Sequence, residues 1–106
     1  RPMVALDLGP DDSLYIAAAF DSEAAGLPNP DDGPFASSVW RVGTVGMDGD
    51  APTVKLLSDP RHLGTLDGMK VESVSVVTTK GGDLQVFVGL DDENYGATLR
   101  QLPPVD

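Results

Sequence analysis

Cysteine is absent from the 106 residues of this chain, which excludes a disulfide framework, a zinc–thiolate site and a thiol nucleophile. Positive charge is scarce as well, because seven Lys and Arg stand against seventeen Asp and Glu, for a formal net charge of −10. A field of that sign repels phosphate backbones and anionic lipid surfaces, so we expect no nucleic acid partner and no membrane insertion. The sequence also lacks any apolar run near the ~20 residues that a membrane-spanning helix needs.

Apolar residues are present in the amount that one domain requires. Leu, Ile, Val and Phe make up about a quarter of the chain, above the roughly one-fifth below which chains remain disordered. Two segments, residues 4–23 and 74–93, alternate apolar and other residues with the period of two that predicts a strand with one buried face. Each segment is interrupted by a turn, at residues 9–13 and 80–83, so each predicts a β-hairpin.

The two predicted hairpins align without a gap at an offset of 70 residues. The matched pairs are Val4 and Val74, Leu6 and Val76, Leu14 and Leu84, Ile16 and Val86, Ala18 and Val88, and Phe20 and Leu90. We expect these residues to form the buried face of each hairpin. An internal repeat of this length is typical of solenoids, propellers and arrays.

Further short strands follow each hairpin. Residues 39–45 and 97–102 predict a third strand in each unit, and residues 53–57 predict a fourth strand in the first unit only. A recurring four-stranded antiparallel meander is typical of the blades of a β-propeller. The predicted fold is therefore all-β, with a first blade over residues 1–58, an inter-blade connection over 59–70 and a second blade, without its fourth strand, over 71–106. A seven-stranded β-sandwich is the alternative.

Two blades are too few to close a propeller, which needs about four or more. The missing blades would come from the remainder of a larger propeller chain or from copies of this chain, three of which would give a six-bladed ring. The start at Arg1 without a methionine and the stop at Asp106 favour a piece of a longer protein. The acidic, cysteine-free composition slightly favours a secreted or periplasmic bacterial protein over a cytoplasmic one.

The second unit carries two motifs that resemble known propellers. Residues 70–76, Lys-Val-Glu-Ser-Val-Ser-Val, are similar to the Lys-Val-Glu-Gly opening of inner strands in six-bladed propellers of the phytase-like and lactonase-like kind, with Ser73 in place of the glycine. Residues 86–96 look like the strand, acidic turn and glycine that follow in bacterial propeller proteins of uncharacterised function. The resemblance covers the second unit well and the first more loosely.

Acidic residues are the candidate metal ligands. Asp91, Asp92 and Glu93 form the densest group of carboxylates, and calcium takes about six to eight oxygens from irregular loops of this kind. The resemblance adds Glu72, because acidic side chains at one end of the inner strands hold divalent metal in the channel of phytase-like propellers. At the 70-residue offset the counterpart of Glu72 is Pro2, so the chain offers one such ligand.

Two further residues are singled out by their rarity. His62 is the only histidine and Trp40 the only tryptophan. His62 falls in the predicted connection, where a lone histidine without a nucleophile motif is expected to be structural or exposed. Trp40 falls on a predicted third strand, where a large ring is expected to pack between blades. No pattern in the sequence indicates a catalytic or ligand-binding residue.

Three functions remain open from the sequence. The first is a binding or scaffold module, with calcium as a stabilising ion; it is favoured because no catalytic motif is found. The second is part of a metal-dependent hydrolase of the phytase-like or lactonase-like sort, with Glu72 as a channel ligand. The third is a lectin-like oligomer that binds sugars between blades. Whether the protein is an enzyme is left open.

Overall fold

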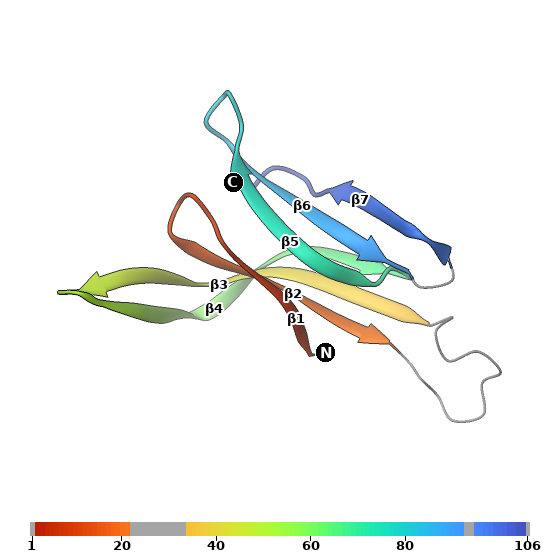
Figure 1. The fold of residues 1–106 in the computed structure, drawn as a ribbon, viewed down its shortest axis with the longest axis horizontal. Helices are drawn as coiled ribbons and strands as arrows, with labels where there is room; N and C mark the ends of the chain where they lie inside the picture. The colour runs from red at the N-terminus through yellow and green to blue at the C-terminus, as the bar shows by residue number, and fades with distance from the viewer. Residues whose placement is uncertain (1, 22–33, 93–94, 106) are drawn as a thin grey trace.

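The computed structural model describes residues 2–21, 34–92 and 95–105, and the regular elements named in this part of the chain are all β-strands (Figure 1). The strands are β1 (Met3–Leu8), β2 (Ser13–Asp21), β3 (Phe35–Asp48), β4 (Ala51–Asp67), β5 (Val71–Thr78), β6 (Leu84–Asp91) and β7 (Ala97–Gln101). No helix among these residues is long and apolar enough to cross a membrane.

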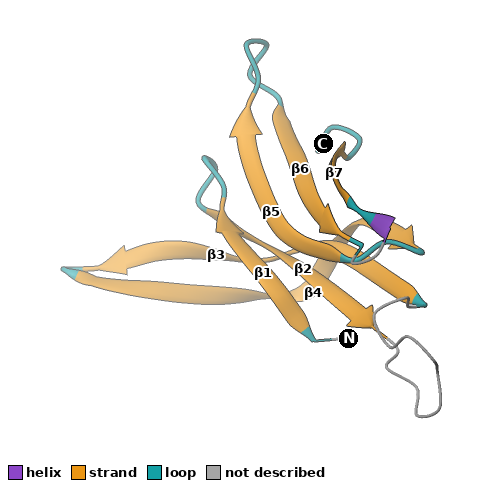
Figure 2. Ribbon diagram, turned by 45° about the vertical axis from the view of Figure 1, so that its right-hand side comes forward, coloured by secondary structure: helices purple, strands orange, loops and turns teal. Residues whose placement is uncertain are grey.

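The strands form two antiparallel meanders, each in chain order. One sheet has the order β1-β2-β3-β4 and the other the order β5-β6-β7. The two sheets lie against each other as layers (Figure 2), and neither closes on itself within the described residues. The prediction of an all-β chain with one four-stranded and one three-stranded meander is confirmed.

The last strand of the first sheet, β4, is longer than the sequence pattern predicts. The fourth strand was expected over residues 53–57, but β4 extends from Ala51 to Asp67 and includes Pro52 and Pro60. Because β4 is an edge strand, the N–H group that each proline lacks is not needed for a neighbour on that side. Residues from Arg61 to Asp67 therefore pair with β3, and His62 lies in a strand opposite Trp40 rather than in a loop.

The two hairpins have the same local geometry at the 70-residue offset. Leu6 lies opposite Ile16, and Val76 lies opposite Val86. In the first turn Gly9 N donates to Ser13 O at 2.9 Å and Asp12 N donates to Gly9 O at 3.0 Å. In the second turn Thr79 N donates to Asp83 O at 2.8 Å and Gly82 N donates to Thr79 O at 3.0 Å.

Asp12 and Gly82, one in each turn, both have positive φ angles, 59° and 87°. Asp is one of the few side chains that tolerates this left-handed region. The same turn is thus built twice, once with an aspartate and once with a glycine at the left-handed position.

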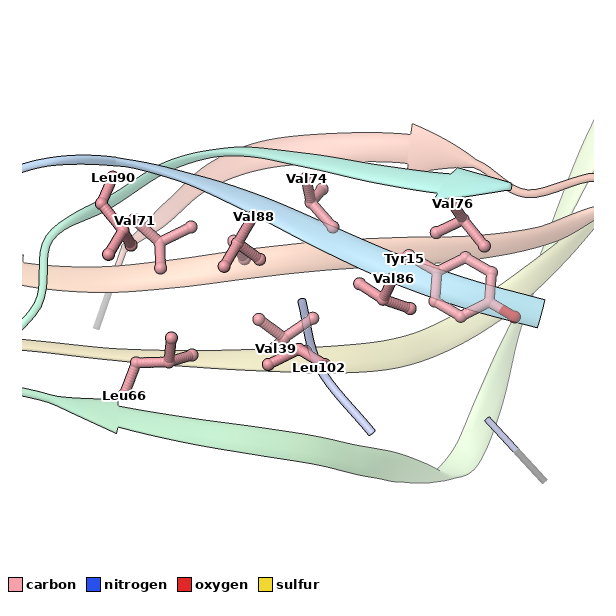
Figure 3. Packing of buried hydrophobic residues seen from close by; sticks show 11 residues of the cluster. Tyr15, Val39, Leu66, Val71, Val74, Val76, Val86, Val88, Leu90 and Leu102 are labelled. Atoms are coloured by element: carbon pink, nitrogen blue, oxygen red, sulfur yellow. The ribbon is translucent and has the colours of Figure 1, made fainter. Parts of the chain in front are cut away.

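One core lies between the two sheets (Figure 3). We call the faces that line it the inner faces and the opposite faces the outer faces. The core residues of the four-stranded sheet are Tyr15, Ala17, Val39 and Leu66, and those of the three-stranded sheet are Val71, Val74, Val76, Val86, Val88 and Leu90, with Leu102 from the segment after β7. Burial of these aliphatic side chains is the main apolar stabilisation of the described part of the chain.

The expected buried face of the first hairpin is confirmed for Leu14 and Ala18, which are 9% and 8% exposed, and is wrong for most of the other residues. Leu6 and Leu8 are 57% and 49% exposed, and Phe20 is 47% exposed, whereas Tyr15 and Ala17 are fully buried. The corresponding expectation for the second hairpin is confirmed, because Val76, Val86 and Val88 lie in the core. The difference arises because the three-stranded sheet covers the Tyr15 side of the first hairpin. The alternation along β1 and β2 does not predict which side that sheet covers.

Two polar side chains join the sheets across this boundary. Ser37 of β3 is fully buried; its Oγ donates to Met69 O at 2.8 Å and accepts from Val71 N at 3.0 Å. Asp7 of β1 accepts a 2.7 Å hydrogen bond at Oδ2 from Val76 N on the edge strand β5. These bonds satisfy backbone groups that the two separate sheets leave unpaired.

Replacing Ser37 by alanine tests this junction. We expect Ser37→Ala to lower the free energy of unfolding by about 1–3 kcal/mol, because Val71 N–H would remain buried without an acceptor. Urea denaturation measures the effect. The matched control is Ser75→Ala, which removes a hydroxyl from the exposed outer face of β5 and should change stability by no more than about 0.5 kcal/mol. Equal effects for the two variants would contradict the assigned role of Ser37.

Candidate functional site

The acidic residues expected to bind metal lie around Lys70. Lys70 N donates to Asp92 Oδ1 at 2.7 Å, and Asp91 N donates to Lys70 O at 3.0 Å. The Lys70 ammonium lies 3.8 Å from Glu72 Oε1. The structure therefore brings Glu72, Asp91 and Asp92 to the same end of the three-stranded sheet, while Glu93 lies outside the described residues.

Lys70 is the cation at the centre of this group. Its ammonium lies 5.9 Å from the centroid of the Phe35 ring, and the Phe35 ring makes an edge-on contact with Tyr95 at 6.4 Å. Such cation–aromatic contacts add to the charge pairing with Glu72. Among the described residues no three His, Asp or Glu side chains are grouped closely enough to hold a metal ion. Calcium binding at residues 91–93 stays a prediction.

A second polar cluster lies at the first hairpin turn. Tyr15 Oη donates to Asp11 Oδ2 at 3.0 Å, Ser13 N donates to Asp11 Oδ1 at 3.3 Å, and Arg41 Nη2 lies 4.0 Å from the same carboxylate. The sequence indicated a turn here but not this cluster, since the three partners come from β2, β3 and the turn itself. The arrangement fixes the turn against the end of the core, because Tyr15 belongs to both.

Burial and hydrogen bonding set the protonation states in this cluster. Burial raises the pKa of Tyr15, and the hydrogen bond to Asp11 with its negative charge raises it further, to about 12. For Asp11, burial alone raises the pKa, but hydrogen bonds from Ser13 and Tyr15 outweigh it and hold the pKa below its ordinary value. At neutral pH the pair therefore consists of a neutral phenol donating to a carboxylate.

A titration tests the Tyr15 environment. Because the pKa of Tyr15 is about 12 in the folded chain and about 10 when unfolded, its stabilising contribution is complete below pH ~10 and is lost as the pH rises towards ~12. The chain has two tyrosines, so in a Tyr95→Phe variant the phenolate absorbance reports Tyr15 alone. We expect its titration midpoint near pH 12. A midpoint near pH 10 would contradict the cluster.

The outer face of the four-stranded sheet carries an organised set of side chains. Directly opposed residues of antiparallel strands share a face, and the register places Leu6, Ile16, Trp40 and His62 in one row across all four strands. A neighbouring row consists of Leu8, Leu14, Gly43 and Leu56. Apolar side chains thus run over the whole width of the sheet.

Trp40 and His62 are held in place within the first row. Their ring centroids are 4.6 Å apart. Trp40 Nε1 donates to Ser38 Oγ at 2.9 Å, and His62 Nε2 is 2.9 Å from Thr65 Oγ1. With its polar atom satisfied by Ser38, the Trp40 ring presents a fixed apolar surface, and it lies on the outer face instead of between the two sheets.

The apolar surface continues onto a hairpin that extends beyond both sheets, which we call the arm (residues 43–56; Figure 1). On one side of the arm the opposed pairs are Gly43 and Leu56, Val45 and Val54, and Met47 and Pro52. The other side pairs Thr44 with Lys55, Gly46 with Thr53 and Asp48 with Ala51. The arm therefore has one apolar side, with Met47 65% and Leu56 70% exposed.

Sequence reasoning missed this surface although its signal is present. The alternation of Val45 and Met47 with Thr44 and Gly46 has the period of two that predicts a strand with one apolar side. Residues 53–57 were recognised as a strand, but pairing with β3 is what places Val54 and Leu56 on the same side as Val45 and Met47. That pairing depends on register, which the alternation alone leaves open.

Comparison of the chain with protein-family models, with curated proteins and with solved structures gives no match. No pocket is found in the part of the chain that the structure describes. The candidate site is consequently defined by the surface itself: the outer face of the four-stranded sheet and the apolar side of the arm. Contiguous exposed apolar surfaces of this kind are typical of protein–protein contact sites.

A pair of equivalent substitutions tests which face is the core. Leu6 and Val76 occupy the same position at the 70-residue offset, but Val76 is 6% exposed and Leu6 is 57% exposed. We expect Val76→Ala to lower the free energy of unfolding by about 2 kcal/mol, because it leaves a cavity. Leu6→Ala should cost less than about 1 kcal/mol. Thermal denaturation at low micromolar concentration measures both, and a larger loss for Leu6→Ala would contradict the assignment.

Proposed function

We propose that this chain is a blade-stacking module of a β-propeller and acts as a binding and scaffold unit. The observation that carries the proposal is that the two sheets meet through faces that are not equivalent. The four-stranded sheet contributes the Tyr15 and Ala17 side of its hairpin to the core. The three-stranded sheet contributes the opposite side, whose residues Val76 and Val86 correspond to Leu6 and Ile16.

Packing through non-equivalent faces is directional. If equivalent faces of the two sheets met, the two faces left exposed to solvent would also be equivalent to each other. Neither could then repeat the same contact with a further sheet. When unlike faces meet, each sheet keeps one face of the complementary kind, and the same contact can be repeated by a further sheet at either end. Successive blades around a propeller axis stack in this manner, each with its front on the back of the next. The shared register and turn hydrogen bonds of the two hairpins support the description of both as one repeated unit.

The edges of the sheets support the same proposal. The first strand of each meander, β1 and β5, is an edge strand, and Asp7 of β1 bonds Val76 N of β5. The two first strands thus lie on the same side of the pair, as first strands do around the channel of a propeller. The resemblance of residues 70–76 to the opening of inner propeller strands is consistent with this position of β5.

The stacking surface is also the binding surface in this proposal. A sheet whose outer face carries Leu6, Ile16 and Trp40 gains stability by covering them, at roughly 25 cal/mol for each Å² of apolar area removed from water. Because Trp40 is held by Ser38, its ring position is set before a partner arrives, which reduces the ordering cost of binding. In this proposal the chain acts as a rigid module on which further β-sheets stack one after another.

Thiol labelling of a tandem protein tests the proposal. Three copies of the chain are joined by flexible Gly/Ser linkers, and Leu6→Cys is introduced into one copy at a time; the absence of native cysteine makes each label unique. In the single chain, labelled at about 5 µM protein where copies do not associate, the thiol should react freely. Within the tandem protein we expect labelling of the second and third copies to slow by about tenfold or more, because a preceding sheet covers the outer face.

The control for this experiment is Lys80→Cys, in the exposed second turn, whose labelling rate should be the same in the single and tandem proteins. Protection of Leu6→Cys in all three copies would indicate a closed ring, and protection in the second and third copies alone would indicate an open stack. Equal labelling of Leu6→Cys in single and tandem proteins would reject the stacking function.

A further inference from the structure

The outer face of the three-stranded sheet is the natural counterpart of the candidate site. Across its strands it presents Ser75, Val77, Phe87 and Leu99, with Val77 and Leu99 exposed. At the 70-residue offset Ser75 and Phe87 correspond to Ala5 and Ala17, which lie on the inner face of the four-stranded sheet. The outer face of the three-stranded sheet thus corresponds to the inner face of the four-stranded sheet. The outer face of the four-stranded sheet, with Leu6 and Ile16, corresponds in turn to the inner face of the three-stranded sheet. The two outer faces of one copy are therefore the counterparts of the two faces that meet in its core.

The middle rows of the two outer faces carry no carboxylate, whereas Asp67 (opposite Ala36) and Asp91 (opposite Ala97) lie at the ends of these faces. The chain has seventeen Asp and Glu, yet none of them is among the row residues of the four-stranded sheet, which are Leu6, Leu8, Leu14, Ile16, Trp40, Gly43, Leu56 and His62, or among Ser75, Val77, Phe87 and Leu99. Burial of these middle rows against each other would bury no carboxylate. Both faces are thus suited to contact with another part of an acidic protein.

We propose that copies of this chain associate head to tail, the outer face of the three-stranded sheet of one copy docking on the outer face of the four-stranded sheet of the next. The inference rests on the proposed stacking function and names its partner, a second copy of this chain. We call the outer face of the four-stranded sheet the receiving face and the outer face of the three-stranded sheet the docking face. The apolar side of the arm continues the receiving face through Leu14, Gly43 and Leu56. It therefore enlarges the contact with the copy that docks.

Charge determines how this association depends on salt. Each copy carries a formal charge of −10, so approach of two copies is opposed at long range, while the contact faces contribute no ion pairs. Raising the ionic strength shortens the range of the repulsion to about 3 Å at 1 M salt. Association should accordingly strengthen with salt, the opposite of the behaviour of an interface held by salt bridges.

Sedimentation velocity of the 106-residue chain measures the association. From about 5 µM to about 500 µM protein in about 0.5 M salt, we expect the average mass to rise two- to threefold from that of the 11.1 kDa chain, towards about 33 kDa if three copies close a ring. A mass that stays at 11.1 kDa over this range, or that falls as salt is added, would overturn the proposal.

Two charged variants establish that unlike faces meet. Leu6→Asp blocks the receiving face and Val77→Asp blocks the docking face, so each variant alone should remain monomeric. Mixed in equal amounts, they should form a dimer of about 22 kDa and no larger species, because one intact face of each kind remains. Dimerisation by the mixture also shows that both variants are folded. If Val77→Asp associates as the unmodified chain does, the contact is not head to tail and the proposal fails.

A matched pair in the arm tests its part in the contact. Val54→Asp changes the apolar side and should weaken association by about tenfold or more, whereas Thr53→Asp, on the other side of the same strand, should change it less than about threefold. Equal effects would remove the arm from the interface.

The tandem protein separates the two proposals. If the single chain stays monomeric while Leu6→Cys is protected in the tandem protein, self-association is rejected and the stacking function stands. If Leu6→Cys is labelled equally in both, the two proposals fall together.

Discussion

The contact between the Tyr15 side of the four-stranded sheet and the Val76 side of the three-stranded sheet is the interaction on which the rest of the described structure depends. A single antiparallel meander exposes both of its faces to water. Each of these sheets is stabilised because the other sheet covers one of its apolar faces. Tyr15 joins this core to the first hairpin turn through its hydrogen bond to Asp11. Burial, with the hydrogen bond to Asp11, raises the pKa of Tyr15, and hydrogen bonds from Ser13 and Tyr15 hold the pKa of Asp11 below its ordinary value despite burial.

Polar groups at the margin of the core determine how the two sheets are aligned. Ser37 bonds Met69 O within the β4–β5 connection and Val71 N at the start of β5, and Asp7 reaches from one edge strand to an N–H of the other. Hydrophobic burial alone is non-directional, whereas these bonds have one geometry. Their joint effect is to set β1 beside β5, which leaves the two outer faces pointing away from each other and open to further sheets.

Much of the local structure could be predicted from the sequence. The strands β1, β2, β5 and β6 follow from alternation, and both turns follow from their Gly, Pro and Asp residues, because these signals act over a few neighbouring residues. The extent of β4 could not be predicted, since Pro52 and Pro60 are compatible with a strand only where it forms an edge. Of the candidate metal ligands, the sequence predicted a common location for Asp91 and Asp92, but it gave no sign that Lys70 would lie among them with Glu72. The cluster of Asp11, Tyr15 and Arg41 was likewise not predictable, because it joins residues from separate strands.

The sequence by itself determined the all-β class, the two meanders and the gapless match between the two hairpins. Only the tertiary structure decided which face of each hairpin is buried. In the first hairpin one side carries Leu6, Leu8 and Ile16, and the other carries Ala5, Asp7, Tyr15 and Ala17. Alternation favours the first side for the core, because the second includes a carboxylate. The second side is the buried one because the three-stranded sheet packs over Tyr15 and Ala17, while Asp7 at the boundary accepts a hydrogen bond from Val76 N.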